Sequence, residues 1–405
     1  MHILEFLLPL VSLFFLFAFL TPRVRDNTFW RASVTPLASI IGSGFLIAVP
    51  FLGGIVGIMT PWAMLLIVVV AYLIGSIIRF NIRYAEPIEA DGSASFIHQI
   101  LEHIASTGLL IAYIISVTFY LRLMSAFILK GFDVSSASNA NALTTGVLLF
   151  IGLVGWRHGL KALERLEEYS VSIKLAIIVA FLLGMLIHDA PAESWANIPT
   201  APDRPILDTF RMLAGLLLVV QGFETSRYLG GEYSPDVRIR SMRLAQCLSA
   251  LIYVGFAILI LPLVHFLSLN NLDETEIIVL SGHVSTVLPI MLIFAATMSQ
   301  FSAAVADTLG GGGIIAEETR KRVSPHLGYL AISVSAIAVV WSTSIFEIVS
   351  YASRAFAFYY FVQTLIALHI VANLPDSNLK WLRLLGLGLM SGILALVMFF
   401  ALPVV

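Results

Sequence analysis

Charged side chains are scarce in this sequence. Asp, Glu, Lys and Arg make up 12% of its 405 residues, whereas about 25% is typical of soluble globular domains. Hydrophobic residues make up 59%. A chain with so few charges is not suited to face water on all sides, so we expect an integral membrane protein. The formal net charge of -2 also argues against a basic surface, and we therefore expect no nucleic-acid partner.

Cysteines and catalytic motifs are also lacking. The single cysteine, Cys247, cannot form a disulfide within the chain, and no Cys/His spacing indicates a zinc site. We find no H-E-x-x-H motif and no paired nucleophile and base. Ser43 lies between two glycines, but no histidine falls in the predicted centre of the membrane to activate it. The sequence therefore predicts no enzyme, no cofactor and no firm metal site.

Long apolar runs are what the sequence has instead. A helix needs about 20 mostly apolar residues to cross a bilayer. The first run, 3–20, lacks the basic start and small-residue cleavage site of a signal peptide, so we interpret it as a retained span. The predicted fold class is an all-α integral membrane protein with about twelve transmembrane helices, at 3–20, 33–58, 62–84, 95–130, 142–156, 167–188, 208–230, 244–268, 285–312, 327–343, 346–372 and 382–403.

The basic residues divide these loops into two sides. Cytoplasmic loops are rich in Lys and Arg. If the loop after the first span is cytoplasmic, that side receives Arg23, Arg25, Arg31, Arg79, Arg83, Arg157, Lys161, Arg165, Arg238, Arg240, Arg243, Arg320, Lys321, Arg322, Lys380 and Arg383. The opposite side keeps only Lys130, Arg204 and Arg211. We therefore expect a protein of the cell membrane, plasma or inner, with both termini outside.

Two of the predicted spans are interrupted by glycines. The second contains Gly42-Ser43-Gly44, and the seventh contains Gln221-Gly222-Phe223-Glu224. A break at mid-membrane is tolerated only where it lines a protein-enclosed or watery site. The N–H groups of one half-helix then attract an anionic group, and the carbonyls of the other attract a cation. The pair predicts a site for a zwitterion, although small residues such as Gly42-Ser43-Gly44 also serve close helix packing.

The two interrupted helices each open a set of five. An odd-numbered repeat is inserted upside down relative to its twin, which is the inverted-repeat plan of many secondary transporters. The predicted organisation is an extra N-terminal helix with its cytoplasmic loop at 1–31, a first repeat at 32–190, a second at 205–373 and a C-terminal helix at 374–405.

The motifs at these breaks resemble those of the amino acid/polyamine/organocation (APC) superfamily over roughly residues 33–400. Ile40-Ile-Gly-Ser-Gly-Phe45 is similar to the first-helix motif of that family, and Gly222-Phe-Glu224 with Glu232…Pro235…Arg238 to its sixth-helix signature. Gly159-Leu-Lys-Ala and Ile173-Lys174-Leu resemble its fourth-to-fifth helix region. The extra first helix, the single helix after the core and Gly310-Gly-Gly-Gly313 depart from the family pattern.

The resemblance implies a LeuT-like fold with substrate between the first and sixth core helices. Carried over to this chain, the backbone of Ile40, Gly42, Ser43 and Gly44 would hold a carboxylate or amine. The sixth-helix side would be lined by Leu218, Gln221 and Gly222, with Phe223 beside the break as a gate. Gln221 stands where an apolar residue is common, which indicates either a polar substrate or a hydrogen bond between helices.

Ionisable groups inside predicted spans suggest how transport is coupled. An ionisable group at the bilayer centre costs at least about 2.5 kcal/mol, so each needs a partner or a purpose. In the resembled family, proton-coupled members have a lysine where Lys174 lies, and a glutamate at the position of Glu224 couples protonation to gating. For Glu224, the alternative is a cap on the half-helix or a pair with Arg227.

A sodium site is the alternative to proton coupling. Asp307 and Thr308 lie on one helical face with the Ala304 carbonyl, as a cation site needs, and in the wider fold the carbonyls of Ala38 and Ile41 would complete it. Lys174 could instead take the place of sodium and exchange protons with Asp307, or the two could form a structural ion pair.

The function predicted from these features is secondary active transport by alternating access. The substrate would be a small polar organic solute such as an amino acid or amine, with a proton, or alternatively sodium, as coupling ion. An ion channel and a membrane-embedded enzyme are the less favoured classes, because half-broken helices in inverted repeats favour alternating access. The expected partners are the small-molecule substrate and the lipid bilayer.

Overall fold

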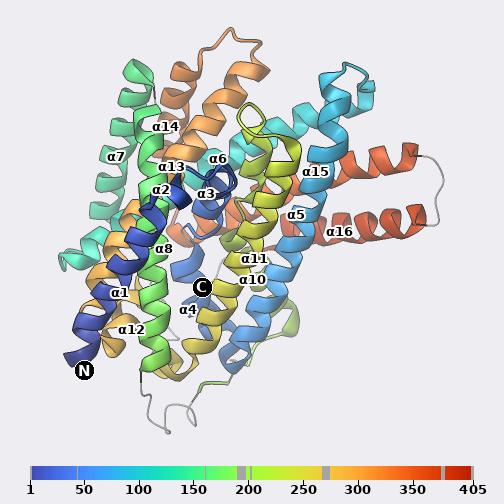
Figure 1. Ribbon diagram of the computed structural model, residues 1–405. Coiled ribbons are helices and arrows are strands. Elements are labelled where there is room, and N and C mark those ends of the chain that lie inside the picture. Colours follow the sequence, from blue (N-terminus) through green and yellow to red (C-terminus); the bar gives the residue numbers. More distant parts are fainter. Residues whose placement is uncertain are drawn as a thin grey trace.

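The structure is a computed structural model that describes residues 2–42, 44–159, 161–188, 198–200, 203–266, 274–374 and 379–402. The part of the chain that it describes is helical and contains no β-strand (Figure 1). The helices before residue 190 are α1 His2–Leu20, α2 Pro22–Arg25, α3 Thr28–Ile40, α4 Gly44–Val56, η1 Gly57–Met59, α5 Thr60–Ala90, α6 Phe96–Gly131, α7 Ala137–His158 and α8 Lys161–Ile187. The later ones are α10 Ile206–Gly215, η2 Leu217–Val220, η3 Phe223–Leu229, α11 Pro235–Leu259, η4 Leu261–Phe266, α12 Glu276–Val284, α13 Leu288–Glu318, α14 Pro325–Ser342, α15 Ile345–Asn373 and α16 Lys380–Phe400. The predicted all-α class is confirmed.

Ten segments of the described chain are long and apolar enough to cross a membrane. One of them, Thr28–Ala90, is 63 residues long and contains α3, α4 and α5. At about 20 residues for each crossing, it is long enough for more than one. The interrupted segment from α10 to η3 is not among the ten. The count is therefore lower than the predicted twelve at these two places. The predicted spans 33–58 and 62–84 fall within the single segment Thr28–Ala90, and the predicted span 208–230 contains the second break.

Helix starts follow local capping chemistry. The side chains of Asn27, Ser95, Ser136 and Ser324 accept hydrogen bonds from backbone N–H groups in the first turns of α3, α6, α7 and α14. Ser344 does the same for α15 in a capping box with Glu347. Such caps satisfy donors that have no partner within the helix. Several helix boundaries lie outside the predicted spans because these polar caps extend the helices beyond their apolar stretches.

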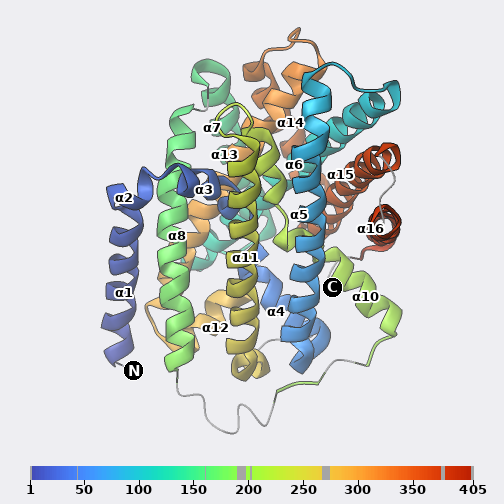
Figure 2. The same cartoon turned by 45° about the vertical axis from the view of Figure 1, so that its right-hand side comes forward.

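The broken helices lie at the centre of the bundle. Every residue of α4 is buried, and residues 32–34 and 36–40 of α3 are buried too. By contrast, α16 buries only Met390, Leu394 and Val397. The outer helix α1 runs beside α8 in both views (Figures 1 and 2), with Leu8 packed over Gly184. The molecule therefore has its interrupted elements inside and its continuous helices outside.

The longer helices surround this centre in pairs. α6 packs along α13 and α15, α7 along α14, and α11 along α3 and α5. α15 and α16 run side by side as a hairpin that projects beyond α5 (Figure 1). The chain after α16 returns to α10, where the Leu402 amide donates to the Arg211 carbonyl at 3.0 Å. Arg354, in α15, also donates to this segment, at the Ala401 carbonyl at 2.6 Å.

Candidate substrate site

Both predicted breaks are present, and they face each other. α3 ends at Ile40 and α4 begins at Gly44, whereas the second segment unwinds after Gly215 and restarts as the 3-10 turn η3. The two sides share one donor, the Tyr253 hydroxyl of α11, which lies 2.9 Å from the Ile40 carbonyl and 2.6 Å from the Val219 carbonyl. This fully buried hydroxyl partly satisfies two carbonyls that the breaks release from their helices.

Glycine is required on both sides because the backbones nearly touch. A Cβ at Gly44 would lie 2.5 Å from the Val219 Cα. A Cβ at Gly222 would lie 2.5 Å from the Ser39 Cβ, and Gly222 also has φ +115°. Any side chain at Gly44 must push the two breaks apart, and one at Gly222 would in addition force an unfavourable backbone conformation. The glycines therefore permit the helices to break, and they also set how closely the two breaks approach each other.

A buried polar group lies beside the second break. The Tyr360 hydroxyl, from α15, donates to Glu224 Oε2 at 2.7 Å and lies 3.4 Å from Gln221 Oε1. Gln221 Nε2 lies 3.5 Å from the Tyr120 hydroxyl of α6, at the limit of a hydrogen bond. All four side chains are at most 4% exposed. The weak contacts of the Gln221 amide leave hydrogen-bonding capacity in the middle of the protein.

Glu224 caps the second break. Its Oε2 accepts a hydrogen bond from the Gly222 amide at 2.9 Å. Its Oε1 is buried and has no hydrogen-bond partner among the described residues. Of the two alternatives considered for this residue, the cap is present, whereas the described partners of Arg227 are other side chains.

The remaining predicted binding residues surround the same place. Ile40, Ile41, Gly42 and Gly44 are buried at the first break. Phe223 is buried and stacks on Tyr360, with ring centroids 5.2 Å apart. Ser43 and the side chain of Leu218 lie outside the described part of the chain.

Lys174 reaches the end of α3 from α8. Its Nζ donates to the Ala38 carbonyl at 2.8 Å, and the residue is only 2% exposed. Ala38 is one of the carbonyls predicted as a sodium ligand. A buried ammonium therefore occupies at least one ligand position of the hypothetical ion site.

Asp307 and Thr308 lie buried on α13. The Ser116 hydroxyl of α6 donates to Asp307 Oδ2. The Thr308 hydroxyl donates to the Ala304 carbonyl at 2.7 Å, within its own helix. Two turns earlier on α13, Gln300 is fully buried, and neither of its amide atoms has a partner among the described residues. Sequence inspection missed Gln300, although its i, i+4, i+7 spacing with Ala304 and Asp307 places it on the same helical face.

A cavity of about 300 Å³ lies at one end of the site, between α3, α6, η3 and α13. Thr35, Tyr113, Thr225 and Tyr228 contribute to its wall. Gly310 and Gly313 belong to the four-glycine run that departs from the expected family pattern, and they line it as well. A Cβ at Gly310 would lie 3.0 Å from the Tyr113 ring, so the absent side chains make room for that ring and for the cavity.

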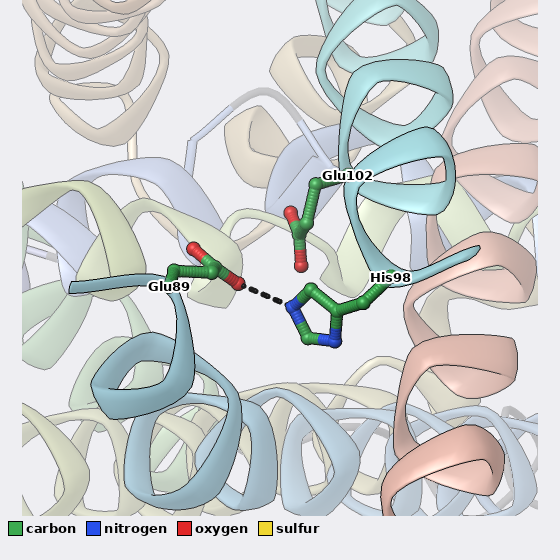
Figure 3. Close-up of side chains that lie close together, drawn as sticks. All are labelled: Glu89, His98 and Glu102. Carbon is green, nitrogen blue, oxygen red and sulfur yellow. Dashed lines mark hydrogen bonds and ion pairs between the residues drawn. The ribbon is translucent and has the colours of Figure 1, made fainter. Parts of the chain in front are cut away.

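An ion network ties this end of the broken segment to its neighbours. Arg227 of η3 donates to Gln363 Oε1 at 2.6 Å, Glu102 Oε1 at 2.9 Å and Glu89 Oε1 at 3.2 Å. His98 Nε2 lies 3.0 Å from Glu89 Oε1. Figure 3 shows this pair, with the Glu102 side chain beside it. The ligand atoms of Glu89, His98 and Glu102 are close enough to hold a metal ion. The Arg227 guanidinium already supplies a cation there, so the cluster does not require a metal to balance its charge.

Arg238 extends the network to α11. It forms a two-pronged pair with Glu86, at 2.9 and 2.6 Å, and donates to the Arg227 carbonyl at 2.8 Å. The sequence pointed to Arg238 as a basic residue of the cytoplasmic side and as part of a family signature. Glu86 and Glu89 lie three residues apart on one face of α5. That spacing was the available signal for a cluster, but the sequence could not show which arginine they meet.

Comparison with known protein families matches residues 22–401 to the APC superfamily transporters. The chain therefore belongs to this superfamily and is a membrane transporter, which confirms the resemblance seen in its motifs. A protein of Aquifex aeolicus (strain VF5), described as uncharacterized, is 47% identical over 356 residues, 87% of each chain.

Proposed function

We propose that this protein is a secondary active transporter of a small zwitterion or amine, an amino acid being the favoured substrate class. The observation that supports this most directly is the pair of facing helix breaks around the Gln221 amide. At one break the first N–H groups of α4 offer positive charge, and at the other the released carbonyls offer negative charge. These groups match a carboxylate and an ammonium. Gln221 provides neutral donors and acceptors for a polar side chain.

We propose proton coupling, with Lys174 as the titrating group. Its ammonium is bound to the Ala38 carbonyl, which favours a lysine in the role that sodium would otherwise fill. Loss of its proton would turn the charge-assisted hydrogen bond to that carbonyl into a weaker neutral one and loosen the hold of α8 on the first break. Asp307 and Thr308 as sodium ligands remain the second candidate, because sodium prefers oxygen ligands and both residues are buried on the same helix.

Substrate-induced thermal stabilisation tests the substrate class and the ion. The purified protein would be screened against amino acids, amines and organic anions, at two pH values, with and without sodium. We expect stabilisation by an amino acid or amine that changes with pH and ignores sodium. Sodium dependence would instead indicate that Asp307 and Thr308 bind sodium as the coupling ion. Stabilisation only by organic anions would contradict the proposed substrate class.

A matched pair of variants ties the result to the site. Gln221→Leu should lower the affinity for the stabilising ligand by about tenfold, which corresponds to the loss of one to two hydrogen bonds. Gln99→Leu, at an exposed position of α6, should leave it unchanged. Uptake into proteoliposomes driven by an imposed pH gradient then separates a carrier from a channel, because carrier uptake saturates with substrate.

We also propose that both termini face the outside of the cell membrane, plasma or inner. The excess of basic residues in alternate loops supports this orientation. Single cysteines at Thr21 and Thr286, in a Cys247→Ser background, would test it with an impermeant thiol reagent on intact cells. Labelling of Thr286→Cys but not Thr21→Cys is expected, and the reverse pattern would invert the topology.

A further inference from the structure

Two adjoining grooves lie on the outer face of α5. The first has a volume of about 460 Å³ and is mostly apolar, with walls from α5, α15 and α16. The second has a volume of about 340 Å³ and lies between α5 and α11. Both are lined by Ser76, Phe80 and Tyr84. The Phe80 and Tyr84 rings, 4.7 Å apart, form a shared ridge, so one ligand can contact both grooves.

The first groove has the length of one lipid chain. It is lined on α5 from Leu73 to Tyr84. Eleven residues of helix correspond to about 16 Å, roughly half of the ~30 Å hydrocarbon core of a bilayer. Leu387, Met390 and Ile393 form the opposite wall. The groove therefore matches the acyl chain of a lipid in one leaflet.

The second groove is basic. Arg79, Arg83 and Arg243 line it, and Arg383 lines the first groove. Arg79 bonds Gln246 and lies 4.7 Å over the Tyr72 ring, and Arg83 pairs with Asp236. Arg243 and Arg383 are exposed. Four guanidinium groups against one carboxylate leave a net positive charge where a lipid phosphate would lie. Basic pockets between transmembrane helices bind anionic head groups in this way.

We propose that these grooves form a binding site for one anionic phospholipid. An acyl chain lies between α5 and the α15–α16 hairpin, and the phosphate contacts Arg243 and Arg383. The lipid would join α11, α5 and α16. Lipid occupancy would therefore stabilise the α15–α16 hairpin against the bundle.

Native mass spectrometry of the purified full-length chain tests this site. Phosphatidylglycerol and phosphatidylcholine with identical acyl chains would be added to the detergent-solubilised protein. We expect preferential retention of phosphatidylglycerol. The double variant Arg243→Gln/Arg383→Gln should lose this retention by roughly fivefold for each arginine removed. Arg240→Gln, one turn away on α11, exposed and outside both grooves, is the matched control.

A second pair of variants tests the acyl groove without changing charge. Gly386 lines the groove and Gly388 does not, yet a Cβ meets no atom within 4 Å at either position. Gly386→Trp should reduce phosphatidylglycerol retention, and Gly388→Trp should not. Equal retention of the two lipids by the unaltered protein, or unchanged retention in Gly386→Trp, would overturn the proposal. A dimer mass that Gly386→Trp abolishes would also overturn it, because it would assign the groove to a second copy of the chain.

Discussion

At the residue scale, buried hydrogen bonds rather than exposed charges define the site. The Tyr253 hydroxyl donates to carbonyls of both breaks. Lys174 donates to the Ala38 carbonyl, and Tyr360 donates to the Glu224 carboxylate. A hydrogen bond from a charged donor contributes about 1.5–3 kcal/mol, and an unsatisfied buried partner costs a similar amount. Single substitutions here should therefore have large effects on binding or coupling.

Lys174 offers a prediction at this scale. Lys174→Ala removes the ammonium and leaves the Ala38 carbonyl without that donor, so proton-driven uptake should fall by at least about tenfold. Lys174→Arg keeps a positive charge that is not released under these conditions. It should preserve folding and substrate binding but abolish the pH dependence of binding. Binding at a series of pH values checks this, and an unaltered pH profile in both variants would remove Lys174 from the coupling mechanism.

At the element scale, two segments that would otherwise be continuous helices are interrupted, one between α3 and α4 and one between α10 and η3. The interruption is stabilised by close backbone contact, with Gly44 against Val219 and Gly222 against Ser39. In a bilayer the freed backbone groups find partners only inside the protein. This explains why α4 is buried on all sides while α1 and α16 present apolar faces outward.

Gly44→Ala tests this contact. The added methyl group would overlap the Val219 backbone, which cannot rotate away as a side chain could. We expect a loss of about 1–3 kcal/mol in the free energy of unfolding, as for overpacked cores, and loss of substrate stabilisation. Gly255→Ala is the control, because a Cβ there, near the end of α11, meets nothing within 4 Å. Equal thermal stability of the two variants would show that the breaks can separate without cost.

At the scale of the whole molecule, the Arg227 network joins η3 to α5, α6 and α15 beside the 300 Å³ cavity. The proposed alternating access requires the breaks to move relative to the surrounding helices. Ion pairs at this end hold η3 in place in the structure. We expect their release to let η3 move and to open the cavity further.

Glu102→Gln should therefore increase access to the cavity. The substitution removes one carboxylate that holds Arg227 but keeps a hydrogen-bonding amide, so the fold should persist. A cysteine at Gly313, in a Cys247→Ser background, should react several-fold faster with a water-soluble thiol reagent. Glu318→Gln is the control, because Glu318 pairs with the neighbouring His103 at a more exposed site, where ion pairs contribute about 0–1 kcal/mol. Equal rates in the two variants would exclude a gating role for the network.

The sequence by itself determined the class of protein and the position of both breaks. Apolar runs of membrane length dictate helices, because lipid offers no partner for an open backbone, and Gly42 and Gly222 mark where those helices are interrupted. The APC motifs predicted the superfamily, which the family match confirms. These features are local, so a linear reading can find them.

Only the tertiary structure decided which groups meet. Tyr253 is 213 residues from Ile40, and Arg227 is 125 residues from Glu102. The adjoining grooves on α5 likewise combine residues of α11, α15 and α16. Such pairings depend on how helices pack rather than on the pattern within each helix, because the apolar faces that drive insertion do not specify their neighbours.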